Sequence, residues 1–247
     1  MTLDRDNRFH NTLHQIASSE NVDQLREVTF KMCNEYGLAN IVYHALYIPE
    51  ATSLNPIVIP TYDPEWIRRY IHNDYFQIDP VVNSGKRGFL PLDWSSVDRD
   101  SSTARSFFAE ADRYGVGRQG ITMPVRGPAG ERALFTITAN LSEVDWRNYR
   151  LDFAKEFQII SHFFHDQAIK LAGYRLAASN HPLSPREMEC LQLTADGLVP
   201  KRVASRLAIS ASAVRLYLRS ACRKLGCANI HQAVAKMVTL ELLHPHL

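Results

Sequence analysis

The stretch TYDPEWIRRYIHNDYFQIDP, residues 61–80, contains two Asp-Pro dipeptides and five aromatic residues. Asp63 has the side chain of a helix N-cap, and Pro64 suits the first helical position, where its missing N–H costs nothing. Glu65 then places an acid at the positive start of the helix. These signals predict a helix over about 64–76.

Three aromatic residues in this stretch recur at every fourth position: Tyr62, Trp66 and Tyr70. A helix would align their rings along one face, with the carboxylate of Asp79 following soon after its end. Such rings most often form plain hydrophobic core. Asp79 favours another interpretation, because each unpaired buried N–H or O–H costs roughly 1–3 kcal/mol and a buried acid needs a partner. We predict that a small ligand with an amide N–H and two carbonyls satisfies these groups.

The composition is typical of a globular protein, and the length of 247 residues suffices for one large domain or two smaller ones. Hydrophobic residues make up 45% and charged residues 22%, so disorder is not expected. No apolar run has the roughly 18 residues of a membrane span, and the polar start is not a signal peptide. Four scattered cysteines suggest reduced thiols, so we expect a cytoplasmic protein without a membrane partner.

The total charge of +2 is unevenly distributed along the chain. Residues 183–247 hold nine Lys and Arg residues against four acids, a net +5, which leaves −3 for the rest. A basic C-terminal segment on an acidic body indicates an anionic partner for that segment.

The coarse pattern divides the chain near residues 173–182, where a Gly and an Asn-His-Pro interrupt helical periodicity. We expect a domain at 1–172, a linker at 173–182 and a second domain at 183–247. In the first, helices are expected at 22–36, 64–76, 103–114 and 143–172, and strands at 41–48, 56–59, 121–125 and 133–139. The fold class expected is α+β, an α/β/α sandwich with an antiparallel sheet, followed by an all-α domain.

The C-terminal segment reads as four short helices. Ser184, Pro185 and Glu187 form a capping box that opens the first of them. A tight break at Ile209-Ser210 joins the second to the third, and a last helix is expected from about 229 to 243. Two helices joined by so short a turn predict a four-helix, helix-turn-helix domain.

The third of these helices carries an apolar and a basic stripe. Val214, Leu218, Ala221 and Leu225 form the inward stripe, and Arg215, Arg219 and Arg223 stand four apart on another face. Most arginine-bearing helix faces are merely solvated. Three stacked arginines without an intervening acid favour DNA, because a guanidinium can bind the O6 and N7 of guanine while other basic groups neutralise phosphates.

This segment resembles the DNA-binding domain of the LuxR-type transcription factors. The matching motifs are L-S-P-R-E, T-A-D-G, V-A-x-x-L-x-I-S, S-A-V-R and R-K-L-G. The resemblance implies that Arg215 and Arg219 read guanines. This sequence departs from the common pattern of the family at Lys201-Arg202. The third helix of the segment, which corresponds to the recognition helix, lacks the usual Asn and His. The implied DNA-binding set is Lys201, Arg202, Arg206, Ser212, Arg215, Arg219 and Arg223.

The first domain resembles the acyl-homoserine-lactone receptors of the same family. The pattern Y-x-x-x-W-x-x-x-Y followed by D-P is shared, as are Trp94, the Gly-x-Thr-x-Pro run at 120–124 and a hydroxyl residue at 136. The resemblance implies that Trp66 donates to the lactone carbonyl, Asp79 accepts the amide N–H, and Tyr62 and Thr136 serve the acyl carbonyl. Trp94 would shield the lactone ring. The acyl tail would contact Tyr70, Val81, Phe107, Ala111 and Ile121.

Other motifs are given structural interpretations. G-V-G-R-Q-G, residues 115–120, has a helix before it and a strand after it, the reverse of a dinucleotide site, so it reads as a helix end and loop. His162 and His165 lie in a Phe-rich helix and do not indicate a metal. No hydrolase or nucleotide-binding motif is present, so we expect neither an enzyme nor a cofactor.

Together these observations predict a regulator of quorum sensing that binds an N-acyl-homoserine lactone. Two copies would pair through the 143–172 helix and bind a palindromic operator, with RNA polymerase as a further partner. One alternative is a LuxR-type-tailed regulator controlled by phosphorylation or another small ligand, although the first 170 residues lack the alternating βα units of a phosphorylated receiver. The other alternative is an enzyme acting on a lactone or amide.

Overall fold

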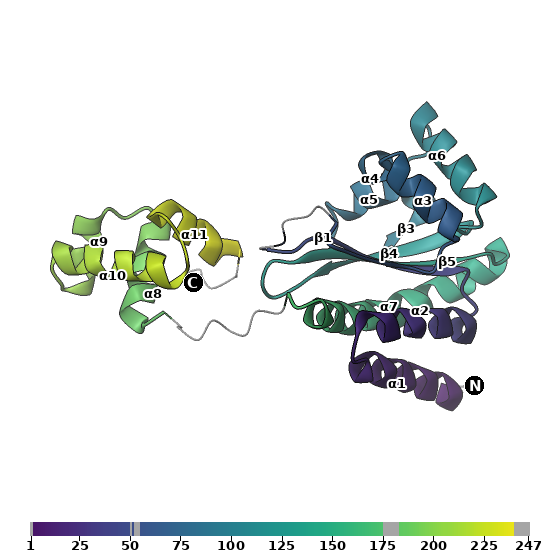
Figure 1. Ribbon diagram of the computed structural model, residues 1–247, viewed down its shortest axis with the longest axis horizontal. Helices are drawn as coiled ribbons and strands as arrows, with labels where there is room; N and C mark the ends of the chain where they lie inside the picture. Colours follow the sequence, from purple (N-terminus) through teal and green to yellow (C-terminus); the bar gives the residue numbers. More distant parts are fainter. Residues whose placement is uncertain (1, 50, 52–54, 175–182, 240–247) are drawn as a thin grey trace. The chain divides into compact units, whose positions relative to one another are not determined.

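A computed structural model describes residues 2–49, 51, 55–174 and 183–239 of the chain (Figure 1). The chain separates into two compact units, one of residues 1–127 with 131–175 and the other of residues 176–247 with 128–130. Most of the linker predicted at 173–182 lies outside the described residues.

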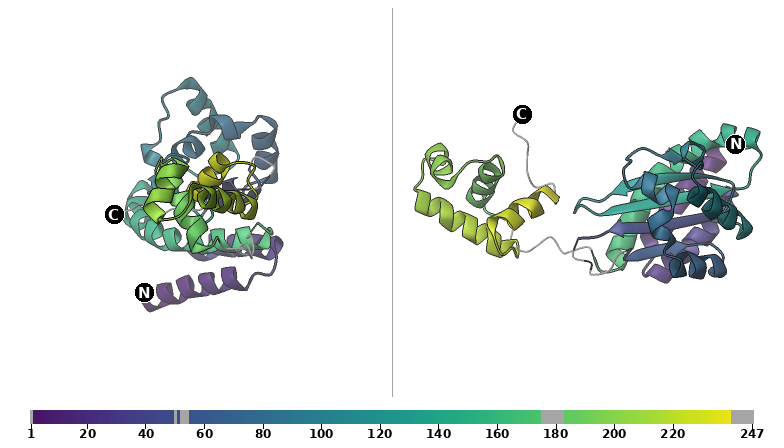
Figure 2. Two further views of the ribbon diagram at one scale, coloured as in Figure 1. Left: turned by 90° about the vertical axis from the view of Figure 1, so that its left-hand side faces the viewer. Right: turned by 90° about the horizontal axis from the view of Figure 1, so that it is seen from above.

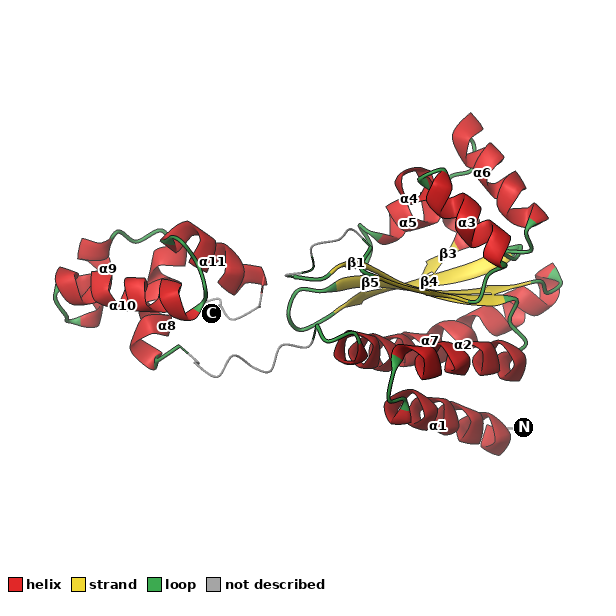
Figure 3. Ribbon diagram, viewed as in Figure 1, coloured by secondary structure: helices red, strands yellow, loops and turns green. Residues whose placement is uncertain are grey.

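A five-stranded sheet forms the middle of the first unit (Figure 3). Its strands are β1 (Asn40–Tyr47), β2 (Ile57–Pro60), β3 (Leu92–Asp93), β4 (Gln119–Arg126) and β5 (Arg132–Ala139), in the order β2-β1-β5-β4-β3. Every neighbouring pair is antiparallel, and β4 and β5 form the predicted hairpin. The α+β sandwich expected from the sequence is confirmed.

One face of the sheet is covered by α2 (Val22–Tyr36) and α7 (Glu143–Leu171), with α1 (Thr2–Ser18) packed outside them (Figure 1). Ile41, Tyr43 and Phe135 point from the strands into this layer, which holds the largest hydrophobic core. Helix α1 was not predicted from the sequence. Its buried apolar contribution is small, with Ile16 fully buried and Phe9 and Leu13 only partly so, and such a narrow stripe gives a weak periodic signal.

The opposite face carries the short helices α3 (Pro64–His72), α4 (Tyr75–Ile78), α5 (Pro80–Gly85) and α6 (Ser102–Arg113), with a 3₁₀ turn, η1 (Trp94–Ser96), after β3 (Figure 2). The single helix predicted at 64–76 is wrong only after His72, where α3 ends. Asp74 adopts a left-handed backbone conformation with φ of 49°, which ends α3 before α4 starts. Asp79 and Pro80 then start α5 with the cap-and-proline arrangement of α3.

The G-V-G-R-Q-G run is a helix end and loop, as predicted. It begins just after α6, and Gly115 and Gly117 take positive φ values of 67° and 117° before β4 starts at Gln119.

The second unit contains α8 (Pro185–Ala195), α9 (Pro200–Leu207), α10 (Ala211–Lys224) and α11 (Ile230–Thr239). Both hydrogen bonds of the predicted capping box at Ser184 and Glu187 are present. Ala208 turns the chain with φ of 53° and Ser210 caps α10, so the tight turn lies where the sequence predicted it. Residues 240–243, predicted as the end of the last helix, lie outside the described residues.

Candidate functional site

A cavity of about 860 Å³ lies between the sheet and helices α3–α6 of the first unit. Nine of the ten residues predicted to bind a ligand line it: Tyr62, Trp66, Tyr70, Asp79, Val81, Trp94, Phe107, Ala111 and Thr136. The volume falls in the usual range for small-molecule sites, and the walls combine aromatic side chains with a few polar groups. The fold therefore brings together residues that are as much as 74 positions apart, from Tyr62 to Thr136.

The tenth residue, Ile121, does not line the cavity. It is buried in the core on the α7 side of the sheet. Successive side chains of a strand point to opposite faces, so the neighbouring Thr122 points to the cavity side and bonds there with Trp94 and Thr136. The predicted contact between Ile121 and an acyl tail is therefore wrong. Thr122, the next residue of β4, lies on the cavity side instead.

Asp79 is buried and already holds three hydrogen bonds. Its Oδ1 accepts from the backbone N–H groups of Val81 at 2.8 Å and Val82 at 3.2 Å, which caps α5. Its Oδ2 accepts from the hydroxyl of Tyr70 at 2.7 Å. The expectation of an acid without protein partners is thus wrong. An ionised carboxylate has about four acceptor positions, however, so three donors leave room for one more.

Burial raises the pKa of the Asp79 carboxyl, while the hydrogen bonds from Tyr70 and the α5 amides oppose that rise. Burial, followed by the nearby charge of Asp79, also raises the pKa values of Tyr62 and Tyr70. Both phenols therefore stay protonated near neutral pH and can donate hydrogen bonds, as Tyr70 does to Asp79.

Trp66 is enclosed by other rings. The centroids of Tyr70, Tyr75 and Tyr114 lie 5.8, 5.8 and 5.5 Å from its own, and that of Phe107 lies at 5.9 Å. Its indole N–H makes no hydrogen bond within the described part of the chain, although the residue is 2% exposed and lines the cavity. A donor in this position is available to an acceptor inside the cavity.

A chain of hydroxyl groups supports another side of the cavity. The indole N–H of Trp94 donates to Oγ1 of Thr122 at 3.0 Å, and that oxygen lies 2.9 Å from Oγ1 of Thr136. Because the indole N–H can only donate, the Thr122 hydroxyl accepts from it and can donate its own hydrogen bond to Thr136. In that arrangement the Thr136 hydroxyl accepts from Thr122, and its own O–H can donate to an acceptor inside the cavity.

Gly120 makes room for Trp94. A Cβ atom at this position would lie 2.6 Å from two carbons of the indole ring, closer than real contacts allow. The glycine at the start of the Gly-x-Thr-x-Pro run therefore has a packing function that its backbone angles alone do not reveal.

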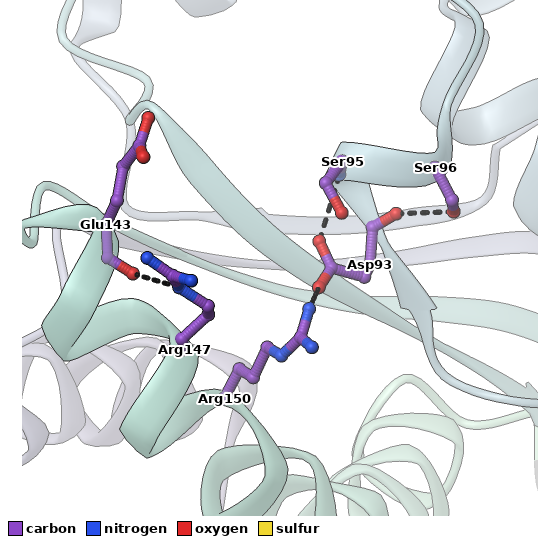
Figure 4. A network of polar contacts seen from close by, with 6 residues as sticks. All are labelled: Asp93, Ser95, Ser96, Glu143, Arg147 and Arg150. Carbon is purple, nitrogen blue, oxygen red and sulfur yellow. Dashed lines mark hydrogen bonds and ion pairs between the residues drawn. The ribbon is translucent and has the colours of Figure 1, made fainter.

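A polar network fixes the turn that carries Trp94 (Figure 4). Asp93 accepts from the backbone N–H of Ser95 through Oδ1 at 2.9 Å and from the guanidinium of Arg150, on α7, through Oδ2 at 3.0 Å. Its backbone carbonyl accepts from the hydroxyl of Ser96 at 2.7 Å, and α7 adds an internal bond from Arg147 to the carbonyl of Glu143. The wall around Trp94 is thereby tied to the long helix across the sheet edge.

Several cavity residues were not predicted from the sequence. His44 and Val42 reach the cavity from β1, Val58 from β2, Leu134 from β5 and Phe76 from α4. The alternation in I-V-Y-H-A-L-Y, residues 41–47, was the sequence signal for the two β1 residues. Because Ile41, Tyr43 and Ala45 belong to the core on one face of the sheet, Val42 and His44 must point to the other face.

The predicted DNA-binding residues all lie on the surface of the second unit. Arg215, Arg219 and Arg223 are exposed on α10, opposite Val214, Leu218 and Ala221, which are buried. Lys201, Arg202, Arg206 and Ser212 are exposed as well. None of these basic side chains forms an ion pair within the described residues, so their charges remain available to an anionic partner.

The histidines set aside as metal ligands have protein contacts. Nδ1 of His165 lies 2.8 Å from the hydroxyl of Tyr43, and Nδ1 of His162 lies 2.7 Å from the carbonyl of Gln158. No cluster of three or more His, Cys, Asp or Glu side chains suited to a metal occurs among the described residues. Within the same ranges, no helix has the length and apolar character needed to cross a membrane.

An α/β/α unit with an internal cavity, joined in one chain to a basic helix-turn-helix unit, defines a ligand-responsive transcriptional regulator. Residues 21–168 match the family model described as "Autoinducer binding domain", and residues 181–237 match "Bacterial regulatory proteins, luxR family". The chain belongs to this family of autoinducer-binding, LuxR-type regulators, whose members are transcriptional regulators and not enzymes.

Individual relatives agree with this assignment. The chain is 52% identical over 178 residues to the transcriptional activator protein RaiR of Rhizobium etli, covering 72% of this chain and 74% of RaiR. It is 25% identical over 218 residues to the transcriptional activator protein VanR of Vibrio anguillarum, covering 85% and 90% of the two chains. Among solved structures, Escherichia coli SdiA shares the fold with a TM-score of 0.71 at 17% identity, over 96% of this chain and 98% of that one.

Proposed function

We propose that the cavity binds an N-acyl-homoserine lactone and that this ligand controls DNA binding by a homodimer. The observation that carries the proposal is the pair formed by the Asp79 carboxylate and the indole N–H of Trp66, an acceptor and a donor on the wall of one otherwise largely apolar cavity. An acyl-homoserine lactone offers the complementary amide N–H, two carbonyls and an apolar tail.

The polar roles follow from the inventory of donors and acceptors. Asp79 has one acceptor position left for the ligand amide, while Tyr70 holds the carboxylate in place with its hydroxyl. Trp66 donates to the lactone carbonyl. Tyr62 and Thr136 remain protonated donors, which suits the acyl carbonyl. Trp94 shields the lactone ring.

The rest of the cavity suits an acyl chain. Val81, Phe107 and Ala111 contribute apolar surface, and Val42, Val58 and Leu134 extend it along the sheet. Each buried CH₂ group contributes about 0.8 kcal/mol, so chain length sets a large share of the affinity.

The output is sequence-specific DNA binding. Arg215 and Arg219 read guanines in the major groove, and the other basic residues of α9 and α10 contact phosphates. Two copies pair through α7 and present their recognition helices to half-sites about one helical turn apart. A regulator that binds promoter DNA acts in the cytoplasm, and RNA polymerase is its expected partner there.

The test is a titration of purified protein with N-acyl-homoserine lactones of several chain lengths. Thermal unfolding and the fluorescence of Trp66 and Trp94 report binding. Binding shifts stability by RT ln(1 + [L]/Kd), so the midpoint should rise with ligand concentration. SdiA is known in complex with octanoyl-rac-glycerol, so that acylglycerol serves as a competing ligand class. Stabilisation by the acylglycerol but by no lactone would contradict the proposal.

The DNA arm compares Arg215→Ala and Arg219→Ala with Arg186→Ala. Arg186 is an exposed arginine on α8 that pairs with Glu189 and lies outside the predicted reading face. Each reading-face variant should lose about 1–3 kcal/mol of operator affinity and relax base preference, while the control binds normally. Mass spectrometry of the ligand after incubation would detect hydrolysis, which the alternative of a processing enzyme requires.

A further inference from the structure

The apolar part of the cavity contains one polar pair that the lactone head does not use. His44 lies on β1 two residues beyond Val42, on the cavity side, and is only 4% exposed. Its neighbours there are Val58, directly across the strand pair, and Leu134 on the other side. The ring of Phe76 lies 4.9 Å from its ring. A histidine among such side chains is costly unless its nitrogen atoms are satisfied.

One nitrogen of His44 is satisfied by the protein. Nε2 lies 2.7 Å from Oδ1 of Asn55. An amide oxygen can only accept, so Nε2 carries the proton in this contact. Burial lowers the pKa of His44 to about 4, although the bond to Asn55 opposes the shift, and the ring is therefore neutral at physiological pH. A neutral imidazole protonated at Nε2 has an unprotonated Nδ1, which is purely an acceptor.

The second nitrogen has no hydrogen-bond partner within the described residues. His44 stands about 6.6 Å along β1 from Val42, which pairs with Thr136, so it faces the acyl chain and not the lactone head. A hydroxyl donates to such a nitrogen, a keto oxygen cannot, and a plain methylene leaves it unpaired.

On the basis of the function proposed above, we propose that the acyl chain of the ligand carries a hydroxyl group, which donates a hydrogen bond to Nδ1 of His44. His44 is then a specificity-determining residue that separates hydroxylated acyl chains from oxo and unsubstituted chains. Asn55 is a positioning residue that fixes which nitrogen carries the proton.

The experiment measures dissociation constants for N-acyl-homoserine lactones of one chain length. The chains carry a hydroxyl, an oxo group or no substituent, with the substituent on the third, fifth or seventh carbon. At least one hydroxylated ligand should bind about tenfold or more tightly than the unsubstituted chain, the ratio that corresponds to about 1.4 kcal/mol. The oxo ligand with the same substitution should bind no more tightly than the unsubstituted one.

Variants identify the residue responsible. His44→Phe keeps a ring against Phe76 and should erase the preference for the hydroxyl while retaining affinity for the unsubstituted chain; His44→Leu repeats the test with a different shape. Asn55→Gly tolerates the left-handed backbone at this position, with φ of 53°, and frees the imidazole to take either tautomer. It should therefore narrow the difference between hydroxyl and oxo ligands. Val58→Ala is the control, and it should weaken all ligands alike.

The outcomes separate this inference from the function on which it rests. Binding of lactones without a hydroxyl preference, or a preference that both His44 variants retain, overturns the inference and leaves the proposed function standing. Failure of every lactone to bind overturns both.

Discussion

Asp79 combines a structural and a proposed recognition function in one carboxylate. Oδ1 caps α5 and Oδ2 accepts from Tyr70. The Asp-Pro pair in the sequence suggests only a helix start, since any N-cap followed by proline looks the same. Its recognition function depends on the cavity that the fold places beside it. Substitutions at this residue therefore need to separate the cap from the ligand contact.

Replacing Asp79 with Asn should separate these functions. The Asn side chain keeps an oxygen for the amides of Val81 and Val82, but its second group is a donor, which cannot accept a ligand N–H. We expect Asp79→Asn to unfold near the wild-type temperature yet lose ligand-induced stabilisation, while Asp79→Ala also loses about 1 kcal/mol of helix capping. Thermal unfolding with and without lactone measures both effects.

The matched control is Asp63→Asn, at the cap of α3, where the side chain accepts from the N–H of Glu65 at 2.7 Å and is exposed. It should leave the ligand response intact. Near-normal lactone sensitivity of Asp79→Asn would contradict the assigned contact.

At the residue scale, the sequence predicted most of the cavity wall, because aromatic spacing and an acid after a helix are visible in the linear pattern. It could not predict that Asp79 already has three donors, since two of them are backbone groups of the next helix. It placed Ile121 on the wrong face because a strand of apolar and small residues gives no clear alternation. His44 was missed because both faces of β1 are covered, so alternation groups Val42 with His44 but does not reveal that their face lines a cavity.

At the scale of elements, β4 and the turn after β3 depend on one close contact. The indole of Trp94 packs on the backbone at Gly120 and bonds with Thr122, two residues further along the same strand. Asp93 and Arg150 hold the other side of the turn. The position of this ring in the cavity is therefore set by the strand, the turn and α7 together.

Gly120→Ala should displace the Trp94 ring. The added methyl group would lie 2.6 Å from ring carbons, and overpacking of this kind costs roughly 1–3 kcal/mol. We expect a lower unfolding temperature and at least tenfold weaker lactone binding, both measured by thermal shift. Gly88→Ala is the control, because its nearest neighbour would be Pro124 at an ordinary 3.7 Å. Unchanged binding in Gly120→Ala would show that the ring position does not limit recognition.

The first helix of the DNA-binding unit carries a pH-sensitive contact. Burial alone would raise the pKa of Glu187, but hydrogen bonds from Lys224 and from the backbone and side chain of Ser184 outweigh it and lower the pKa to about 2. This carboxylate thus stabilises the fold above the ordinary pKa of 4.5, and the contribution is lost as pH falls from there toward 2.

Hydrogen exchange of α8 peptides in the full chain measures this contribution. Glu187→Gln should lower the protection free energy of the α8 amides at pH 7 by up to about 3 kcal/mol. The difference in protection free energy between this variant and wild type should shrink between pH 4.5 and pH 3. Glu189→Gln, on an exposed residue of the same helix, should change protection little at either pH. A pH-independent difference for Glu187→Gln would contradict the charge-based account.

The elements themselves were predictable where caps and periodicity agree. The capping box at Ser184 and the boundaries of α2 and α7 follow directly from sequence. The break between α3 and α4 could not be predicted, because Asp74 enters a left-handed conformation that the aromatic periodicity across it conceals. The two-residue strand β3 is too short to leave any periodic pattern.

At the scale of the whole molecule, α7 connects ligand binding with proposed pairing. Its inner side packs on the sheet through residues such as Phe157 and Phe164. Its outer side carries Val144, Leu151, Ile159 and Phe163, each between 49% and 64% exposed. Their spacings of seven, eight and four residues follow one side of the helix. Exposed apolar side chains that recur on one side of a surface helix favour an interface, and we propose that a second copy of the chain forms it.

Leu151→Glu combined with Phe163→Glu should separate ligand binding from DNA binding. Pairing would remove the two introduced acids from water, which is costly without a partner of opposite charge. A two-fold interface would also bring them close to the same acids of the second copy, so both effects strongly oppose pairing. We expect sedimentation to detect monomers and operator affinity to fall by at least a hundredfold, since each monomer contacts one half-site. Lactone stabilisation should persist, because neither residue lines the cavity. Phe89→Glu, on an exposed loop residue, is the control for added charge. A double variant that still forms dimers would place the interface elsewhere, and loss of lactone stabilisation in that variant would show that ligand binding itself requires the paired state.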